Sequence, residues 1–303
     1  MSVFSRFHEL LQEAIVRTLG WSSLRPVQEL SGEALLDGKD AIILAPTAGG
    51  KTEAAFFPAL SEVLSRQEEG VQILYIAPIK ALLNNQADRL ATYTGMVGLD
   101  RFVWHGDTKA SQKKKFLRGP TTVLMTTPES LEVMCISEKT DETKIFSNLR
   151  FAIIDEIHAL AGSDRGAHLR SVLARIMRLS RFDVQRIGLS ATVGNPDDIL
   201  DWIGSDSSRE GIVIDPPAKP SRRQLSIVYR ETEPELALSA AASAREVKSL
   251  LFCQSRSLAE NIGRRLASRH VDMYVHHGSI SKEERQEAEA HFQEGGAACI
   301  VCT

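Results

Sequence analysis

Residues 45–52 combine side-chain types that together can hold phosphate groups. The segment follows the apolar run at 40–44 and consists of Ala45, Pro46, Thr47, Ala48, Gly49, Gly50, Lys51 and Thr52. After a short buried strand and a glycine-bearing turn, backbone N–H groups and a helix N-terminus can face nucleotide phosphates. Lys51 would then reach the β- and γ-phosphates, and Thr52 would ligate Mg²⁺. The segment predicts binding of a nucleoside triphosphate; the alternative is an ordinary turn before a helix.

Two neighbouring acids extend this prediction from binding to hydrolysis. Asp155 and Glu156 directly follow a second apolar run at 149–154. An acid at the C-terminal end of a buried parallel strand lies where such sheets bind ligands. Asp155 can hold Mg²⁺ through water, and Glu156 can orient and deprotonate the attacking water. The alternative is a solvated helix start, where the helix dipole favours acids; the presence of Lys51 and Thr52 favours hydrolysis.

Alternating apolar and amphipathic stretches indicate the elements that must position these residues. Helices are expected between the strands, for example at 51–65 and 167–180. Strands are expected at 41–45, 71–77, 101–105, 121–126, 150–155 and 185–190. This alternation predicts an α/β fold with a parallel sheet covered on both faces.

A proline-rich polar segment divides the chain. Residues 215–222 are typical of an interdomain linker. Alternation resumes after it, with strands expected near 224–230, 248–253, 271–276 and 297–303. We therefore expect a first domain at 1–214, with a short helical lead-in, and a second domain at 223–303.

Composition excludes some classes of protein. The chain has 303 residues, 43% hydrophobic and 25% charged, with a net charge of −3. It is not a polycation, so any nucleic-acid site must be a local basic surface. It has no run of 18 apolar residues and no signal-peptide core, which predicts a cytoplasmic protein without a membrane partner. Cys299 and Cys302 lie in a strand-like apolar run, which favours packing over metal binding.

The motifs occur in an order that resembles superfamily 2 DEAD/DEAH-box helicases, and several are most similar to the Lhr-like (large helicase-related) branch. Motifs I, II and III correspond to residues 45–52, 155–158 and 190–192, and the adenine-reading motif to 25–28. Motif Ia corresponds to 77–86, the segment before motif Ib to 104–108, and motif Ib to 126–131. Motif IV corresponds to 252–256 and the segment after it to 276–279. Together they span about residues 20 to 303. The resemblance implies two RecA-like lobes with parallel sheets, ATP and Mg²⁺ as cofactors, and ATP hydrolysis by a helicase or translocase acting on DNA or RNA. The branch points to DNA repair.

The resemblance also implies roles in the ATP site. Arg25 and Gln28 would read adenine, since a glutamine amide can both donate and accept a hydrogen bond. Phosphate contacts would come from Thr47, Ala48, Gly49, Gly50, Lys51 and Thr52, with Lys51, Asp155 and Glu156 as the catalytic residues. His158, Ser190 and Thr192 would couple hydrolysis to strand movement; for Ser190 and Thr192 the alternative is a cap of the following helix.

Nucleic acid is the partner that the resemblance implies, bound by its phosphate backbone. The residues that match the corresponding motifs are Pro78, Lys80, Thr127, Pro128, Glu129, Ser255, Arg256, His277, Gly278 and Ser279. The basic run Lys109–Arg118 adds a local positive field, or is a solvated helix face. For His277 we prefer the motif role, because a metal site at 276–277 lacks partners at suitable spacing.

The chain ends at Thr303, within a segment that matches the start of motif V. In the resembled family the later motif VI supplies arginine fingers, which contribute about 10³–10⁵ in rate. We therefore expect an incomplete second lobe and slow turnover, or a protein partner that supplies the missing segment. The alternative to a helicase is a fragment that binds ATP and nucleic acid with little turnover.

Overall fold

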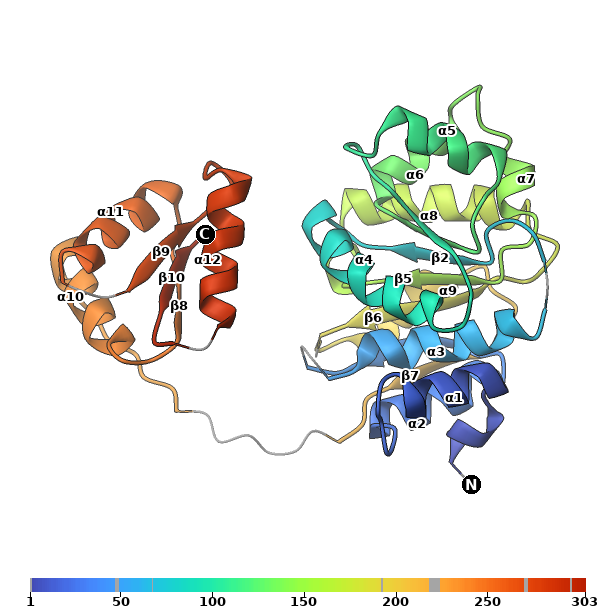
Figure 1. The fold of residues 1–303 in the computed structure, drawn as a ribbon, viewed down its shortest axis with the longest axis horizontal. Helices are drawn as coiled ribbons and strands as arrows, with labels where there is room; N and C mark the ends of the chain where they lie inside the picture. Colours follow the sequence, from blue (N-terminus) through green and yellow to red (C-terminus); the bar gives the residue numbers. More distant parts are fainter. Residues whose placement is uncertain are drawn as a thin grey trace. The chain divides into compact units, whose positions relative to one another are not determined.

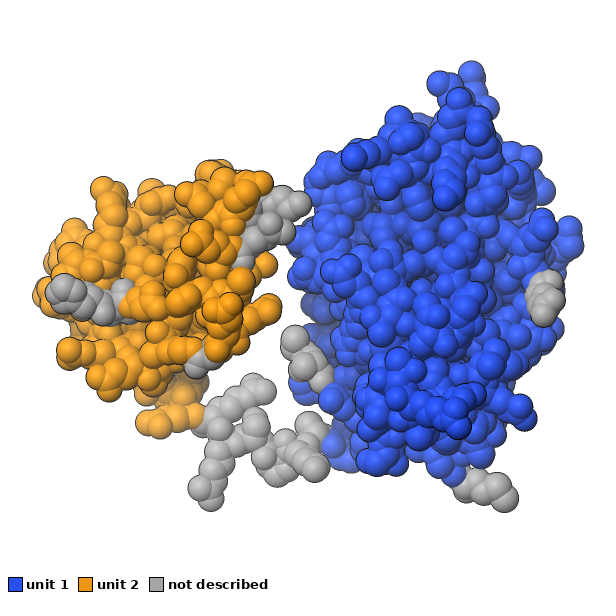
Figure 2. Space-filling view, viewed as in Figure 1, with its two compact units in different colours: residues 1–219 blue, residues 220–303 orange. Residues whose placement is uncertain are grey.

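The computed structural model describes residues 2–46, 49–66, 68–191, 193–217, 224–269, 272–294 and 296–303. The chain divides into two compact units, residues 1–219 and residues 220–303, coloured separately in Figure 2. Each unit has its own sheet and its own hydrophobic core.

A seven-stranded sheet in the order β3-β4-β2-β5-β6-β1-β7 forms the centre of unit 1 (Figure 1). Every neighbouring pair in it is parallel. The strands are β1 (Asp40–Leu44), β2 (Ile73–Ile76), β3 (Arg101–Trp104), β4 (Val123–Thr126), β5 (Phe151–Ile154), β6 (Gln185–Ser190) and β7 (Gly211–Ile214). The predicted parallel sheet is confirmed, and its inner strands β1, β2 and β5 are mostly apolar because both of their faces are buried.

Helices cover both faces of this sheet. One core joins alternate strand residues to η1 (Val3–Arg6), α1 (Glu9–Arg17), α2 (Pro26–Leu36), α3 (Lys51–Leu64) and α4 (Lys80–Gly95). The other core joins the remaining strand residues to α5 (Ala110–Arg118), α6 (Pro128–Cys135), α7 (Glu142–Phe146), η2 (Ile157–Ala159), α8 (Asp164–Met177) and α9 (Pro196–Gly204). Residues that follow the strands therefore gather at one edge of the sheet, where their carboxyl ends lie.

Unit 2 repeats the pattern on a smaller scale. Its three-stranded parallel sheet has the order β8-β10-β9. The elements are α10 (Glu233–Ala244), β8 (Ser249–Phe252), α11 (Arg256–Ala267), β9 (Met273–His276), α12 (Lys282–Gln293) and β10 (Cys299–Cys302). Helices α10 and α11 share a core with one face of the sheet, and α12 contacts β9 and β10. Cys299 and Cys302 are both buried in β10, which confirms the packing interpretation.

Two details of the sequence interpretation need correction. The strand expected near 224–230 is wrong: Leu225, Ile227 and Tyr229 alternate, but they are exposed and their segment forms no strand with the rest of the described chain. Strand β7 (Gly211–Ile214) is not among the strands expected from the sequence. Its four residues pair with β1 at the edge of the sheet. Most of the proposed linker, residues 218–222, lies outside the described residues.

Candidate nucleotide-binding site

The loop between β1 and α3 has the backbone geometry that its glycines predict. Gly50 is the N-cap of α3 and has a φ of 95°, which favours glycine. The N–H of Gly49 donates to the carbonyl of Pro46 at 2.9 Å, and a Cβ added at Gly49 would lie 2.8 Å from that oxygen. Both positions therefore require glycine. Thr47 and Ala48 lie outside the described residues.

Lys51 is buried at the start of α3. Its Nζ donates to the carbonyl of Ala45 at 2.6 Å. Within the described part of the chain, no ion pair joins Lys51 to an acidic side chain. A buried ammonium with a carbonyl partner has unused capacity for an anion, because each ammonium carries three donors. This environment suits a phosphate group.

Arg25 and Gln28 lie against this loop. The Oε1 of Gln28 accepts from the N–H of Arg25 at 2.9 Å, and its Nε2 donates to the carbonyl of Gly50 at 3.5 Å. A Cβ added at Gly50 would lie 2.8 Å from Gln28 Nε2 and 3.2 Å from Arg25 Cδ. The two residues are thus placed beside the phosphate loop. Trp21 packs on Phe57 with ring centroids 5.7 Å apart.

Asp155 directly follows β5 and is buried. Its Oδ1 accepts from the N–H of Glu156 at 3.0 Å, and its Oδ2 accepts from the hydroxyl of Tyr75 at 2.7 Å. Burial raises the pKa of the Asp155 carboxyl, and the hydrogen bond from Tyr75 opposes that rise. Burial likewise raises the pKa of Tyr75, with the nearby Asp155 charge adding to it. The Tyr75 hydroxyl is thus the hydrogen-bond donor and the Asp155 carboxylate the acceptor.

Glu156, His158 and Ser190 form a chain of polar contacts. His158 Nε2 lies 3.4 Å from Glu156 Oε2, and His158 Nδ1 lies 3.1 Å from Ser190 Oγ. Glu156 has a φ of 45°, a left-handed conformation that costs free energy in a non-glycine residue. The backbone after β5 thus holds the Glu156 side chain beside His158. Thr192 lies outside the described residues, so its relation to these polar contacts is not described.

Thr52 and Asp155 form a donor set that fits Mg²⁺. The ion prefers oxygen ligands and is usually held by one or two carboxylates together with substrate phosphates. Each Asp155 oxygen accepts one hydrogen bond, Oδ1 from Glu156 and Oδ2 from Tyr75, and keeps further acceptor capacity for a metal-bound water. In the described residues no group of three or more His, Cys, Asp or Glu side chains could hold a metal by itself.

The structure adds polar residues that sequence reasoning did not single out. Tyr75 is buried in β2, and the side chains of Tyr93 and Arg89 both contact Glu53, the residue after Thr52. A tyrosine inside a fully buried strand normally needs a partner for its hydroxyl. The strand sequence Ile-Leu-Tyr-Ile therefore could have indicated that the Tyr75 hydroxyl has a buried hydrogen-bond partner.

The proposed nucleic-acid residues of unit 1 lie beyond β2 and β4. Thr127 caps α6, with Pro128 and Glu129 in its first turn. Arg165 donates to the carbonyl of Pro78 at 2.6 Å and to Glu129 at 2.7 Å, and so fixes the two loops together. Lys80 forms an ion pair with Asp107.

Helix α5 carries the basic run. Lys113 lies over the ring of Trp104, 5.3 Å from its centroid. The exposed Lys114 and Lys115 extend the positive surface along the helix. This placement fits both readings of the run, a solvated helix face and a local positive field.

The matching residues of unit 2 form a second cluster. Ser255 caps α11, and Arg256 donates to Ser279 Oγ at 2.8 Å. The N–H of Ser279 donates to His277 Nδ1 at 3.3 Å, while His277 Nε2 lies 2.8 Å from Glu260 Oε1. A Cβ added at Gly278 would lie 3.6 Å from Arg256 Nη2. The structure thus brings together the residues after β8 and β9.

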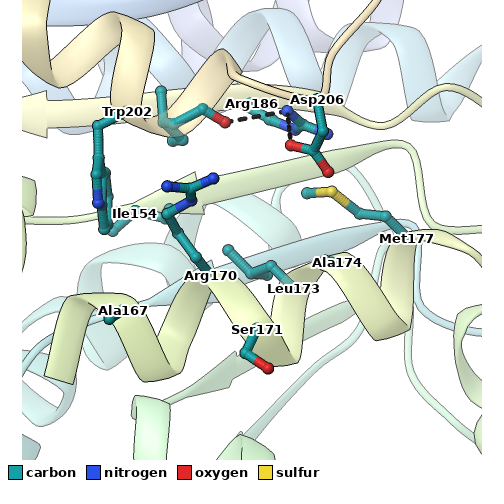
Figure 3. A pocket seen from close by; sticks show the side chains of 11 residues that line it. Ile154, Ala167, Arg170, Ser171, Leu173, Ala174, Met177, Arg186, Trp202 and Asp206 are labelled. Atoms are coloured by element: carbon teal, nitrogen blue, oxygen red, sulfur yellow. Dashed lines mark hydrogen bonds and ion pairs between the residues drawn. The ribbon is translucent and has the colours of Figure 1, made fainter. Parts of the chain in front are cut away.

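A cavity of about 320 Å³ lies between α8 and α9 (Figure 3). In it the buried Arg186 donates to the carbonyl of Ile203 at 3.0 Å and to Asp206 at 2.8 Å. Arg170 reaches across from α8, 5.9 Å from the Trp202 ring centroid. These contacts join β6 and α8 to the end of α9, so Arg186 and Arg170 stabilise the packing of these elements.

Comparisons with known proteins identify the family. Residues 25–199 match the DEAD/DEAH box helicase model, and residues 233–303 match the helicase conserved C-terminal domain. Because the first match alone covers more than half of the chain, the chain belongs to the DEAD/DEAH box helicase family.

Individual relatives agree with the expected branch. The Lhr helicase/uracil glycosylase of Escherichia coli (strain K12) is 30% identical and covers 91% of this chain and 23% of that protein. The Lhr helicase/probable uracil glycosylase of Mycolicibacterium smegmatis is 28% identical and covers 98% of this chain and 23% of that protein. The chain thus spans about a quarter of the length of these curated relatives.

A solved structure gives the same result for the fold. The structure of Mycobacterium smegmatis helicase Lhr bound to ssDNA and AMP-PNP matches with a TM-score of 0.81 at 29% identity, covering 100% of this chain and 42% of that one. The prediction of two RecA-like lobes is confirmed. In the described part of the chain, no helix is long and apolar enough to span a membrane.

Proposed function

We propose that the chain is the ATP-hydrolysing, nucleic-acid-binding part of an ATP-dependent helicase or translocase. One observation carries the proposal: Lys51 and Thr52 begin α3 after β1, while Asp155 and Glu156 follow β5 at the same edge of the parallel sheet. That edge is where open α/β sheets bind ligands.

Each residue has a distinct task in this proposal. Lys51 and the backbone N–H groups of the loop bind and orient the triphosphate, and Arg25 and Gln28 select adenine. Thr52 and Asp155 hold Mg²⁺, which when bound neutralises charge on the transferred phosphoryl group. Glu156 positions the attacking water and takes its proton. His158 and Ser190 connect Glu156 to the segment after β6.

Nucleic acid is bound by its backbone in this proposal. The supporting features are caps, hydroxyls and basic side chains at Thr127, Ser255, Arg256 and Ser279, which suit phosphate oxygens rather than base edges. Single-stranded DNA is the proposed substrate, and DNA repair in the cytoplasm the proposed setting. The support for DNA is that one relative's structure is described as bound to ssDNA, and that two relatives are named helicase and uracil glycosylase.

Binding of nucleic acid should therefore depend strongly on salt and only weakly on nucleotide sequence. We expect affinity for several unrelated single-stranded oligonucleotides to fall together, by about tenfold or more between about 50 and 200 mM salt, because binding releases counterions. Fluorescence anisotropy across a salt series measures this directly.

Two variants of α11 test whether Arg256 contributes to the salt dependence of nucleic-acid binding. Arg256→Ala should reduce the salt slope by about one unit and weaken all sequences alike. Arg264→Ala is the matched control, since it removes an exposed arginine of the same helix whose side chain contacts Asn261. A strong preference for one sequence that persists at high salt would contradict backbone recognition.

A further inference from the structure

Tyr75 carries a polar group in a strand that has no other polar side chain. Strand β2 reads Ile73-Leu74-Tyr75-Ile76, and Tyr75 is fully enclosed in the core. A phenylalanine would make the same apolar contacts, so packing alone does not require the hydroxyl. The hydroxyl must be understood from its partners.

The register of the sheet explains why Tyr75 meets Asp155. Strands β2 and β5 are parallel neighbours, and Tyr75 pairs with Ile153. Side chains alternate along a strand, so Tyr75 and Ile153 share one face, and Asp155 returns to that face two residues later. Both Tyr75 and Ile153 belong to the core that contains α3. Tyr75 therefore lies on the face of the sheet that α3 helps to cover.

The hydroxyl contacts one of the two proposed metal ligands. Tyr75 donates to Asp155 Oδ2 at 2.7 Å. The N–H of Glu156 donates to the other oxygen, Oδ1, at 3.0 Å. With a donor on each oxygen, the plane of the Asp155 carboxylate is fixed.

A carboxylate held in this way presents its remaining lone pairs to a metal ion in one orientation. Partners of this kind orient metal ligands and strongly affect metal affinity.

We propose that Tyr75 is a positioning residue that orients Asp155 for Mg²⁺. This inference rests on the proposed function. Tyr75 itself touches neither nucleotide nor metal. It acts through Asp155, so its loss should weaken the magnesium-dependent part of nucleotide binding and leave the magnesium-free part in place.

Tyr75→Phe tests this inference because it removes only the hydroxyl. We expect nucleotide affinity in EDTA to equal that of the wild type, and the Mg²⁺ concentration that gives half-maximal strengthening of nucleotide binding to rise about 10- to 100-fold. Calorimetric titration of ATP with and without Mg²⁺ gives both values without requiring turnover. Thermal unfolding shows whether the variant is folded.

Tyr93→Phe is the matched control. It also removes a buried tyrosine hydroxyl, one that donates to Glu53, the residue after Thr52. It should leave the Mg²⁺ dependence unchanged. In an Asp155→Asn background, Tyr75→Phe should add little further change, because residues acting through one another are not additive.

The outcomes separate this inference from the proposed function. If the wild type binds ATP with Mg²⁺-dependent strengthening that Tyr75→Phe leaves unchanged, the inference is wrong and the proposed function stands. Equal effects of Tyr75→Phe and Tyr93→Phe would also overturn it, since they would indicate only the loss of a buried hydroxyl. A wild type that binds no ATP would overturn both.

Discussion

Glu156→Gln is expected to lower ATP hydrolysis by about 10²- to 10⁴-fold, the usual contribution of a positioned general base. Glutamine has nearly the same shape but cannot take the proton from the attacking water. Thr52, Asp155 and Lys51 remain, so Mg·ATP affinity should change little. Single-turnover hydrolysis and calorimetric ATP binding, measured on the same preparation, separate the two effects.

The control for this variant is Glu138→Gln, which changes an exposed glutamate in the same unit. It should hydrolyse ATP at the wild-type rate. If Glu156→Gln also hydrolyses at that rate, Glu156 is not the water-activating residue. A parallel loss of ATP affinity would instead indicate that Glu156 serves binding.

Lys51→Ala should weaken ATP binding by about 10- to 100-fold, the equivalent of one charge-assisted hydrogen bond of roughly 1.5–3 kcal/mol. The reason is that Lys51 is buried beside the loop and would lose its contact with the β- and γ-phosphates. Calorimetry at constant ionic strength measures the change.

Lys114→Ala is the charge-matched control, because it removes an exposed lysine from α5. Its ATP affinity should equal that of the wild type. Equal affinity in Lys51→Ala, with an unchanged melting temperature, would refute the assignment of residues 45–52 as the phosphate loop.

Much of the arrangement around the loop could be predicted because it depends on local rules. A strand, a glycine-bearing turn and a helix in succession fix where Lys51 lies, and the acids after β5 must lie at the same edge as the loop after β1 in a parallel sheet. The roles given to Arg25 and Gln28 remain predictions, although both lie against Gly50.

Other features depend on contacts distant in sequence and could not be predicted. Tyr75 and Asp155 are 80 residues apart and meet only through the register of β2 and β5. Arg165 joins Pro78 and Glu129 in the same long-range manner. The alternation at 224–230 predicted a strand from a local pattern, but strand formation needs a paired neighbour, and none is present among the described residues.

The central claim is that this chain hydrolyses ATP in response to nucleic acid. A single-turnover assay of residues 1–303, with and without single-stranded DNA or RNA, tests it most directly. The account predicts slow hydrolysis that single-stranded nucleic acid accelerates and that Glu156→Gln lowers by about 10²- to 10⁴-fold. A rate that is indifferent both to nucleic acid and to Glu156→Gln, or no binding and no hydrolysis of ATP at all, would contradict it.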